Sequence, residues 1–303
     1  MLKVKIRDIE FKSPIIASSG TYGYGYEVDD FVDLSKIGCI ITKSITKEPR
    51  KGNPSPRIHE SRSGMINAIG LANVGVKEFC KNKLSKLNSI DTRFIISVAG
   101  TTIEEYIQVV NKIEKSEGLH VGYEINVSCP NIKKGGMEFG LNKDATYELT
   151  SKLRNITDKL LIIKLSPNVT NITEIAESAE LGGADAISAI NTFIGLAIDH
   201  KTGKMLLSTT FGGVSGPAIK PLALAKIHSI YKKIKIPIIG IGGISSFEDI
   251  IQFLRVGSSM VQIGTLNYRD PSIISLFYND LKVFLENKKI SHICDLVGDY
   301  IEH

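Results

Sequence analysis

Eight short apolar segments recur along the chain and alternate with segments that have helical spacing. The apolar segments are residues 14–17, 39–42, 94–98, 123–127, 160–165, 186–190, 237–241 and 260–263. Most are unbroken runs, as is typical of parallel strands buried on both faces. Helical spacing is clearest at 103–115, 145–155, 172–181, 222–233 and 247–256. The alternation predicts an α/β fold, a (β/α)8 TIM barrel.

The chain has the organisation expected of one domain, residues 1–303. No linker rich in Pro, Gly or Ser divides it, and the first and last predicted strands enclose nearly all of it. Residues 2–6 and 9–11 predict an N-terminal β-hairpin that plugs the bottom of the barrel. The connections 43–94 and 192–237 are longer than a helical crossover requires. Such insertions usually build a binding surface, so we expect them at the C-terminal face.

Composition and charge exclude several other classes of protein. The 37 Lys and Arg against 32 Asp and Glu leave a net charge of +5, without the concentrated basic runs of a nucleic-acid-binding chain. The four cysteines are widely spaced, with no CxxC pair, so neither a disulfide framework nor a metal site is expected. The start lacks a signal-peptide core, and no apolar run approaches the ~20 residues of a membrane span. We expect a cytoplasmic protein with no nucleic-acid or membrane partner.

Polar residues follow the predicted strands, at the end where a barrel builds its active site. In chain order they are Ser18, Ser19, Gly20, Lys43, Ser44, Ser97, Asn126, Ser128, Cys129, Lys164, Ser166, Asn191, Thr192, Gly242, Gly243, Gly264 and Thr265. Strands of any barrel end at the surface, where polar residues are common, so no single position is evidence for a functional site. Together the lysines, amides, cysteine and glycines favour a functional site.

Glycines follow the last two predicted strands. Gly242-Gly243 and Gly264-Thr265 stand where barrels commonly bind phosphate through backbone N–H groups, because no Cβ blocks the approach of an anion. The alternative is a pair of tight turns. The phosphate interpretation implies a phosphate-bearing substrate or cofactor.

Two lysines and one cysteine are open to two interpretations each. Lys43 and Lys164 either extend from strand ends into solvent or supply fixed positive charge to a developing anion, such as a reduced flavin. Cys129 is either an apolar filler or, between polar neighbours at the mouth, a base or nucleophile. No histidine follows an equivalent strand, which favours a proton acceptor over a Cys/His hydrolase.

Four motifs resemble the class 1 dihydroorotate dehydrogenases. They are Asn-Val-Ser-Cys-Pro-Asn at 126–131, Lys-Glu-Pro-Arg-Lys-Gly-Asn-Pro at 47–54, Asn-Ala-Ile-Gly-Leu at 67–71 and Gly-Gly-Val-Ser-Gly-Pro-Ala-Ile-Lys-Pro at 212–221. Within class 1, Ser-Gly-Pro-Ala-Ile-Lys-Pro and Asn-Ile-Lys-Lys-Gly-Gly resemble the B subtype. That subtype is a catalytic subunit that works with an iron-sulfur flavoprotein and NAD.

The resemblance implies oxidation of (S)-dihydroorotate to orotate in pyrimidine synthesis. Cys129 would take the C5 proton while the C6 hydride goes to the N5 atom of FMN. The partner subunit would carry FAD and a 2Fe-2S cluster, in a heterotetramer built on a homodimer core. The sequence has no cysteine cluster or GxGxxG motif of its own for these groups.

The resemblance also assigns binding residues. Substrate contacts would come from Lys43, Asn67, Ala68, Ile69, Gly70, Leu71, Asn126, Asn131, Asn191 and Thr192. FMN contacts would come from Ser19, Gly20, Thr21, Lys43, Ser44, Ser97, Asn126, Lys164, Ile190, Gly216, Gly242, Gly243, Gly264 and Thr265. Ser97 departs from the asparagine common in this family, so either a water bridges its contact with the flavin or that contact is lost.

Four alternatives remain. The fumarate-dependent A subtype usually differs in the two subtype motifs. A dihydrouridine synthase would require a basic RNA surface and an added helical domain. A phosphate-binding isomerase or synthase leaves the setting of Cys129 unexplained. The intact Cys129, Lys164 and Asn126 argue against a non-catalytic scaffold.

Overall fold

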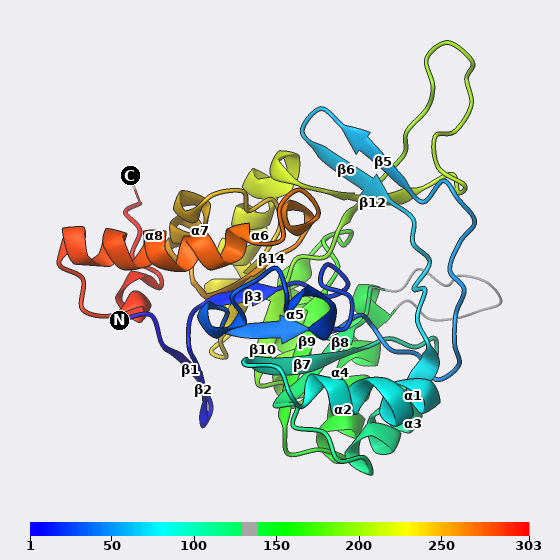
Figure 1. Cartoon of the computed structure of the whole chain (residues 1–303), viewed down its shortest axis with the longest axis horizontal. Helices are drawn as coiled ribbons and strands as arrows, with labels where there is room; N and C mark the ends of the chain where they lie inside the picture. Colours follow the sequence, from blue (N-terminus) through cyan, green and yellow to red (C-terminus); the bar gives the residue numbers. More distant parts are fainter. Residues whose placement is uncertain (129–138, 303) are drawn as a thin grey trace.

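A closed barrel of eight parallel strands forms the centre of the computed structural model, which describes residues 1–128 and 139–302 (Figure 1). The strands pair around the barrel in chain order: β3 (Ile15–Ala17), β4 (Cys39–Ile41), β7 (Arg93–Val98), β8 (Gly122–Asn126), β9 (Leu160–Leu165), β10 (Ala186–Ala189), β13 (Ile238–Ile241) and β14 (Ser258–Ile263). Nearly all of these residues are buried, which explains their continuous apolar sequence. The predicted barrel is confirmed, with strand boundaries within two residues of those expected.

Helices follow the barrel strands and cover the outside of the barrel (Figure 1). They are α1 (Gly75–Glu78), α2 (Leu84–Leu87), α3 (Ile103–Glu114), α4 (Lys143–Arg154), α5 (Ile172–Leu181), α6 (Lys220–Tyr231), α7 (Phe247–Arg255) and α8 (Ile273–Lys288). A π-helical turn, Phe79–Lys83, joins α1 to α2. Side chains cap several N-termini; Thr102, for example, accepts from the Glu105 N–H. In the described part of the chain, no helix is both long and apolar enough to cross a bilayer.

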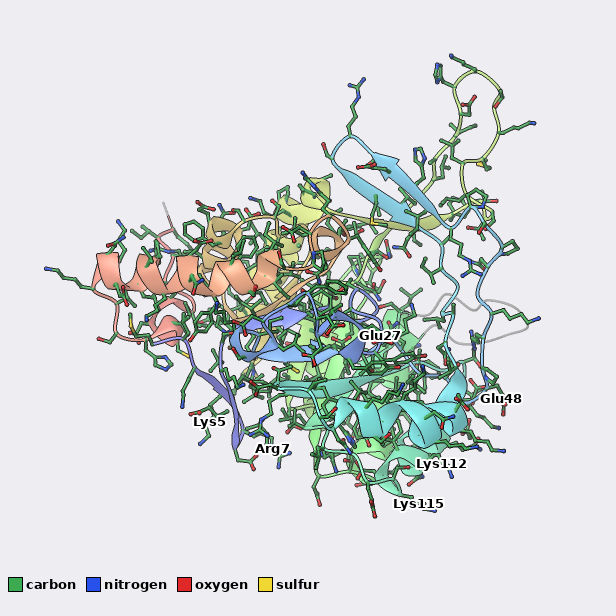
Figure 2. All side chains as sticks on the ribbon, in the orientation of Figure 1. Lys5, Arg7, Glu27, Glu48, Lys112 and Lys115 are labelled. Atoms are coloured by element: carbon green, nitrogen blue, oxygen red, sulfur yellow. The ribbon has the colours of Figure 1, made fainter. Side chains whose placement is uncertain are left out.

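The predicted N-terminal hairpin is present as β1 (Val4–Ile6) paired with β2 (Ile9–Phe11). Arg7 lies at its turn (Figure 2) and donates to the Asp158 carbonyl at 2.9 Å, just before β9. Its guanidinium also lies 3.4 Å from the Asp185 carboxylate, just before β10. Both partners lie at the amino ends of barrel strands, so the hairpin packs at the bottom of the barrel.

The two long insertions form a second sheet that the sequence did not predict. Its antiparallel order is β11 (Phe193–Gly195), β12 (Gly212–Ser215), β6 (Gly64–Asn67) and β5 (Ile58–Ser61). In Figure 1 the β5–β6 hairpin and the segment between β11 and β12 extend from the same side of the barrel. A Cβ added to Gly213 of β12 would lie 2.2 Å from Thr192 Oγ1, just after β10. The sheet therefore lies at the C-terminal face, as expected of these insertions.

Asp185 joins three parts of the barrel bottom, so its loss should destabilise the fold. Its carboxylate accepts from the Leu161 N–H at 2.8 Å and from Arg154 at 2.7 Å, besides facing Arg7. We expect Asp185→Ala to lower the free energy of unfolding by about 2 kcal/mol, because the Leu161 N–H and the two guanidinium groups lose an acceptor.

Urea titration followed by circular dichroism measures this change. Asp158→Ala is the matched control, because Asp158 is exposed and only its backbone carbonyl accepts from Arg7. The control should stay within ~0.5 kcal/mol of the parent chain. Equal losses in both variants would contradict the assigned role of Asp185.

Candidate active site

A buried ion pair lies inside the barrel below its C-terminal mouth. The Lys164 ammonium of β9 lies 3.5 Å from Oε1 of Glu124 on β8, and the two side chains are 8% and 0% exposed. Glu124 Oε2 accepts from Ser188 Oγ of β10 at 3.0 Å and from Gln262 Nε2 of β14 at 2.5 Å. Lys164 therefore points inward and does not extend into solvent.

Lys43 follows β4 and approaches the same mouth. A Cβ on Gly20 would lie 3.2 Å from the Lys43 ammonium, so the lysine side chain passes directly over this glycine. Burial first, and the positive charge of Lys164 second, lower the pKa of Lys43. Two ammonium groups are thus held close enough to repel, an arrangement that an anionic ligand would relieve.

A chain of hydroxyl groups joins the ends of β3, β4 and β7. Ser19 Oγ donates to the Thr42 carbonyl at 2.8 Å and lies 3.4 Å from Ser44 Oγ. Ser44 Oγ lies 2.8 Å from Ser97 Oγ, and Ser97 is fully buried. Ser97 therefore has a protein partner for its hydroxyl. Ser97 lies on β7, the expected strand. The Ser44 hydroxyl links it to the Ser19 hydroxyl.

Two amide side chains meet at the ends of β8 and β10. Asn191 Nδ2 donates to Asn126 Oδ1 at 3.1 Å, and the same oxygen accepts from the Ser128 N–H at 3.2 Å. Asn191 Oδ1 accepts from the Thr192 N–H at 2.9 Å. These contacts fix the orientation of both amides, each of which presents donor and acceptor groups to a ligand.

The second sheet brings residues 67–71 to the mouth. Asn67 is paired with Gly213 and donates from Nδ2 to the Gly213 carbonyl at 3.3 Å. Asn53 holds the next residues, since its backbone N–H donates to the Ile69 carbonyl and its side chain to the Ala68 carbonyl. Gly70 and Leu71 follow with positive φ angles of 73° and 55°.

Glycines crowd together beside the start of α6 and leave space only for backbone. A Cβ on Gly243 would lie 2.7 Å from the Lys220 backbone nitrogen and 2.9 Å from the Gly216 carbonyl oxygen. A Cβ on Gly216 would lie 2.5 Å from Gly64 Cα. No side chain caps the N-terminus of α6. This cradle of backbone groups at a helix N-terminus fits a phosphate group.

The end of β14 completes the cradle. Thr265 Oγ1 donates to Ser215 Oγ at 2.8 Å, which ties β14 to β12. Thr21 Oγ1 accepts from Asn267 Nδ2 at 2.8 Å and donates to the Ser18 carbonyl. A Cβ on Gly264 would meet nothing closer than 3.7 Å, so Gly264 is not constrained by crowding. Ile190 packs near Gly242 from the end of β10.

Two of the expected site residues, Cys129 and Asn131, lie outside the described residues. Among the residues that the structure describes, no three His, Cys, Asp or Glu side chains cluster as metal ligands do. The remaining expected residues come from the ends of all eight barrel strands and from the second sheet and the residues directly after its strands.

Comparison with known proteins identifies the family. The family model described as dihydroorotate dehydrogenase matches residues 1–285. This chain belongs to the dihydroorotate dehydrogenase family. A protein of Geotalea uraniireducens is 44% identical over 300 residues, covering 99% of this chain and 98% of the relative. Proteins of Fusobacterium nucleatum and Geobacillus sp. are 43% and 45% identical, each over 98% of this chain and over 97% and 95% of their own length. All three are named dihydroorotate dehydrogenase B (NAD(+)), catalytic subunit.

Sequence reasoning missed several polar residues in and near the barrel mouth. Glu124, Gln262 and Ser188 form the network under Lys164. Asn168 donates to the Thr192 carbonyl at 3.0 Å and accepts from the Ile194 N–H, so it holds the segment after β10. A charged residue inside an otherwise apolar strand was the available signal for Glu124.

The charge on Lys43 costs stability, and removing it should strengthen the fold. At neutral pH folding buries a charged group beside Lys164, whereas the unfolded chain leaves that group in water. We expect Lys43→Met to raise the free energy of unfolding by on the order of 1 kcal/mol at pH 7. Urea titration of the chain without bound ligand measures it.

The sign of the pH dependence follows from the lowered pKa. As pH rises through the native pKa of Lys43, the native state loses its proton before the unfolded state does, so the parent chain gains stability. The advantage of Lys43→Met should therefore shrink at alkaline pH. Lys81→Met, at an exposed lysine, is the control. An advantage that does not change with pH would contradict burial of the Lys43 charge.

Proposed function

We propose that this chain is the catalytic subunit of a B-type dihydroorotate dehydrogenase and oxidises (S)-dihydroorotate to orotate in pyrimidine synthesis. The observation that carries the proposal is the full-length match to relatives with this name, at 41–45% identity. The two inward lysines and the paired amides at the barrel mouth support it independently, because they suit a small anionic substrate with amide groups.

The substrate side of the proposal uses the amides and one lysine. Amides present both donors and acceptors, which matches the imide edge of a neutral ring, and Lys43 offers a positive charge to the carboxylate. Cys129 is the proposed base that takes the C5 proton. The proposed substrate contacts are Lys43, Asn67, Ala68, Ile69, Gly70, Leu71, Asn126, Asn131, Asn191 and Thr192.

The cofactor in the proposal is FMN, with its phosphate in the glycine cradle. When bound, FMN supplies the acceptor for the C6 hydride. Lys164 supplies positive charge at the flavin N1 and C2 carbonyl, where negative charge collects on reduction. The proposed contacts are Ser19, Gly20, Thr21, Lys43, Ser44, Ser97, Asn126, Lys164, Ile190, Gly216, Gly242, Gly243, Gly264 and Thr265.

The proposal includes an electron-transfer partner. The relatives' names, a catalytic subunit with NAD(+), support a second subunit. In the proposal this partner carries FAD and a 2Fe-2S cluster. In this proposal the chain forms one FMN-binding domain, residues 1–303, of a cytoplasmic heterotetramer built on a homodimer core.

The visible absorption spectrum of the purified chain tests the proposed reaction. We expect a flavin band that anaerobic dihydroorotate bleaches. Cys129→Ala should keep the band but bleach at least ~100-fold more slowly at neutral pH, because general-base catalysis contributes about that much. A flavin band that dihydroorotate cannot bleach would refute the substrate, and unchanged bleaching in Cys129→Ala would refute the base.

The glycine cradle makes a separate prediction about cofactor binding. Gly243→Ala places a methyl group 2.7 Å from the Lys220 backbone nitrogen, at a φ of 78° that already disfavours alanine. The backbone must shift, and the dissociation constant for FMN should rise at least ~10-fold, equivalent to about 1.4 kcal/mol. Fluorescence titration with FMN measures it.

Gly203→Ala is the matched control for this substitution. Gly203 has a similar φ of 68°, but a Cβ there would meet no atom within 4 Å. It carries the same backbone strain without the clash, so FMN affinity should be unchanged. If both variants bind FMN as the parent chain does, the phosphate does not lie in the cradle.

A further inference from the structure

Glu124 is a fully buried carboxylate in the barrel interior, and the proposed reaction gives it no role. It lies on β8 two residues before Asn126, so the two side chains share the inward face of the strand. Asn126 is paired in register with Lys164 of β9. Glu124 therefore lies one layer deeper in the barrel than the ends of β8 and β9.

The two oxygens of the Glu124 carboxylate have different partners. Oε2 accepts from Ser188 Oγ at 3.0 Å and from Gln262 Nε2 at 2.5 Å. Ser18 Oγ donates to Gln262 Oε1 at 3.1 Å and so fixes the amide. With Oε2 held by side chains of β10 and β14, Oε1 faces the Lys164 ammonium at 3.5 Å.

A buried carboxylate is expensive to desolvate, so its retention here requires a partner charge. Lys164 is the cation within salt-bridge distance of it in the described part of the chain. Lys43, the other cation at the mouth, repels Lys164. Without Glu124, that repulsion would be unopposed and Lys164 would have no fixed acceptor beneath it.

Other titratable groups nearby cannot replace Glu124. Burial first, and the Glu124 charge second, raise the pKa of the Cys39 thiol on β4, so this group stays neutral. Ser188 and Gln262 carry no charge. The negative charge that faces Lys164 in the described barrel interior is therefore that of Glu124.

We propose that Glu124 is a positioning residue that holds the Lys164 ammonium against the bound flavin. Glu124 does not touch the flavin itself. The inference rests on the proposed function, because it requires FMN in the mouth. It predicts that Glu124 and Lys164 act as one unit on FMN affinity and on the flavin midpoint potential.

A double-mutant cycle on the full chain tests this unit. The proteins are the parent chain, Glu124→Gln, Lys164→Met and the double variant, and the readouts are the FMN dissociation constant and the midpoint potential without dihydroorotate. We expect each single variant to bind FMN at least ~10-fold more weakly and to lower the potential, because positive charge leaves the flavin. The double variant should match Lys164→Met within a factor of ~3.

Two results would overturn the inference. Independent effects that multiply in the double variant would mean that the two residues do not act together. A raised potential with unchanged FMN affinity in Glu124→Gln would mean that the carboxylate only opposes the field of Lys164 and does not position it.

Gentler variants keep the test valid if Glu124→Gln does not fold. Ser188→Ala and Gln262→Met each remove one of the two hydrogen bonds to Oε2 but leave the carboxylate charge in place. Each should shift FMN affinity and potential in the same direction by a smaller amount, and should have no effect in the Lys164→Met background. Effects that persist in that background would contradict the inference.

Failure of the Glu124 inference can be told apart from failure of the proposed function. If the parent chain binds no FMN, the proposed function fails. If it binds FMN and dihydroorotate bleaches it while the Glu124 and Ser188 variants match the parent, only the role of Glu124 fails.

Discussion

Closure of the parallel sheet is the constraint on which the rest of the structure depends. Eight strands that run in one direction bring all of their carboxyl ends to one mouth, so residues as distant in sequence as Ser19 and Thr265 line one space. The hairpin at the bottom and the second sheet at the top are consistent with this polarity. Arg7 binds groups at the amino ends of β9 and β10, whereas Gly213 packs against Thr192 beyond the carboxyl end of β10.

The barrel interior combines two requirements that conflict. Apolar side chains fill most of it and stabilise the fold, but charged groups lie directly beneath the mouth. The lowered pKa of Lys43 shows that burying its charge beside Lys164 is unfavourable. A chain selected for stability alone would place apolar residues there, so the retained charges are themselves evidence for a ligand.

The sequence predicted the barrel well because buried parallel strands and covering helices leave strong periodic signals. The second sheet was missed because its strands have three or four residues, are half-exposed or contain glycine, and show no clean alternation. Glu124 was missed for a different reason. A single acid in Tyr-Glu-Ile-Asn signals a buried charge, but its partner cannot be named until the pairing of β8 with β9 brings Lys164 beside it.

The barrel mouth has two kinds of group that suit anions: neutral backbone in the glycine cradle, and the charged side chains of Lys43 and Lys164. The glycine cradle lies beside the N-terminus of α6 and leaves room only for backbone, so a phosphate there would be bound by backbone groups and not by a lysine. Lys43 and Lys164 are then left for other negative charge, and Glu124 offsets one of them. The described interior therefore retains one excess positive charge. That excess suits an anionic substrate whose oxidation also moves negative charge onto a neighbouring group, and a phosphate-only barrel has no need of it.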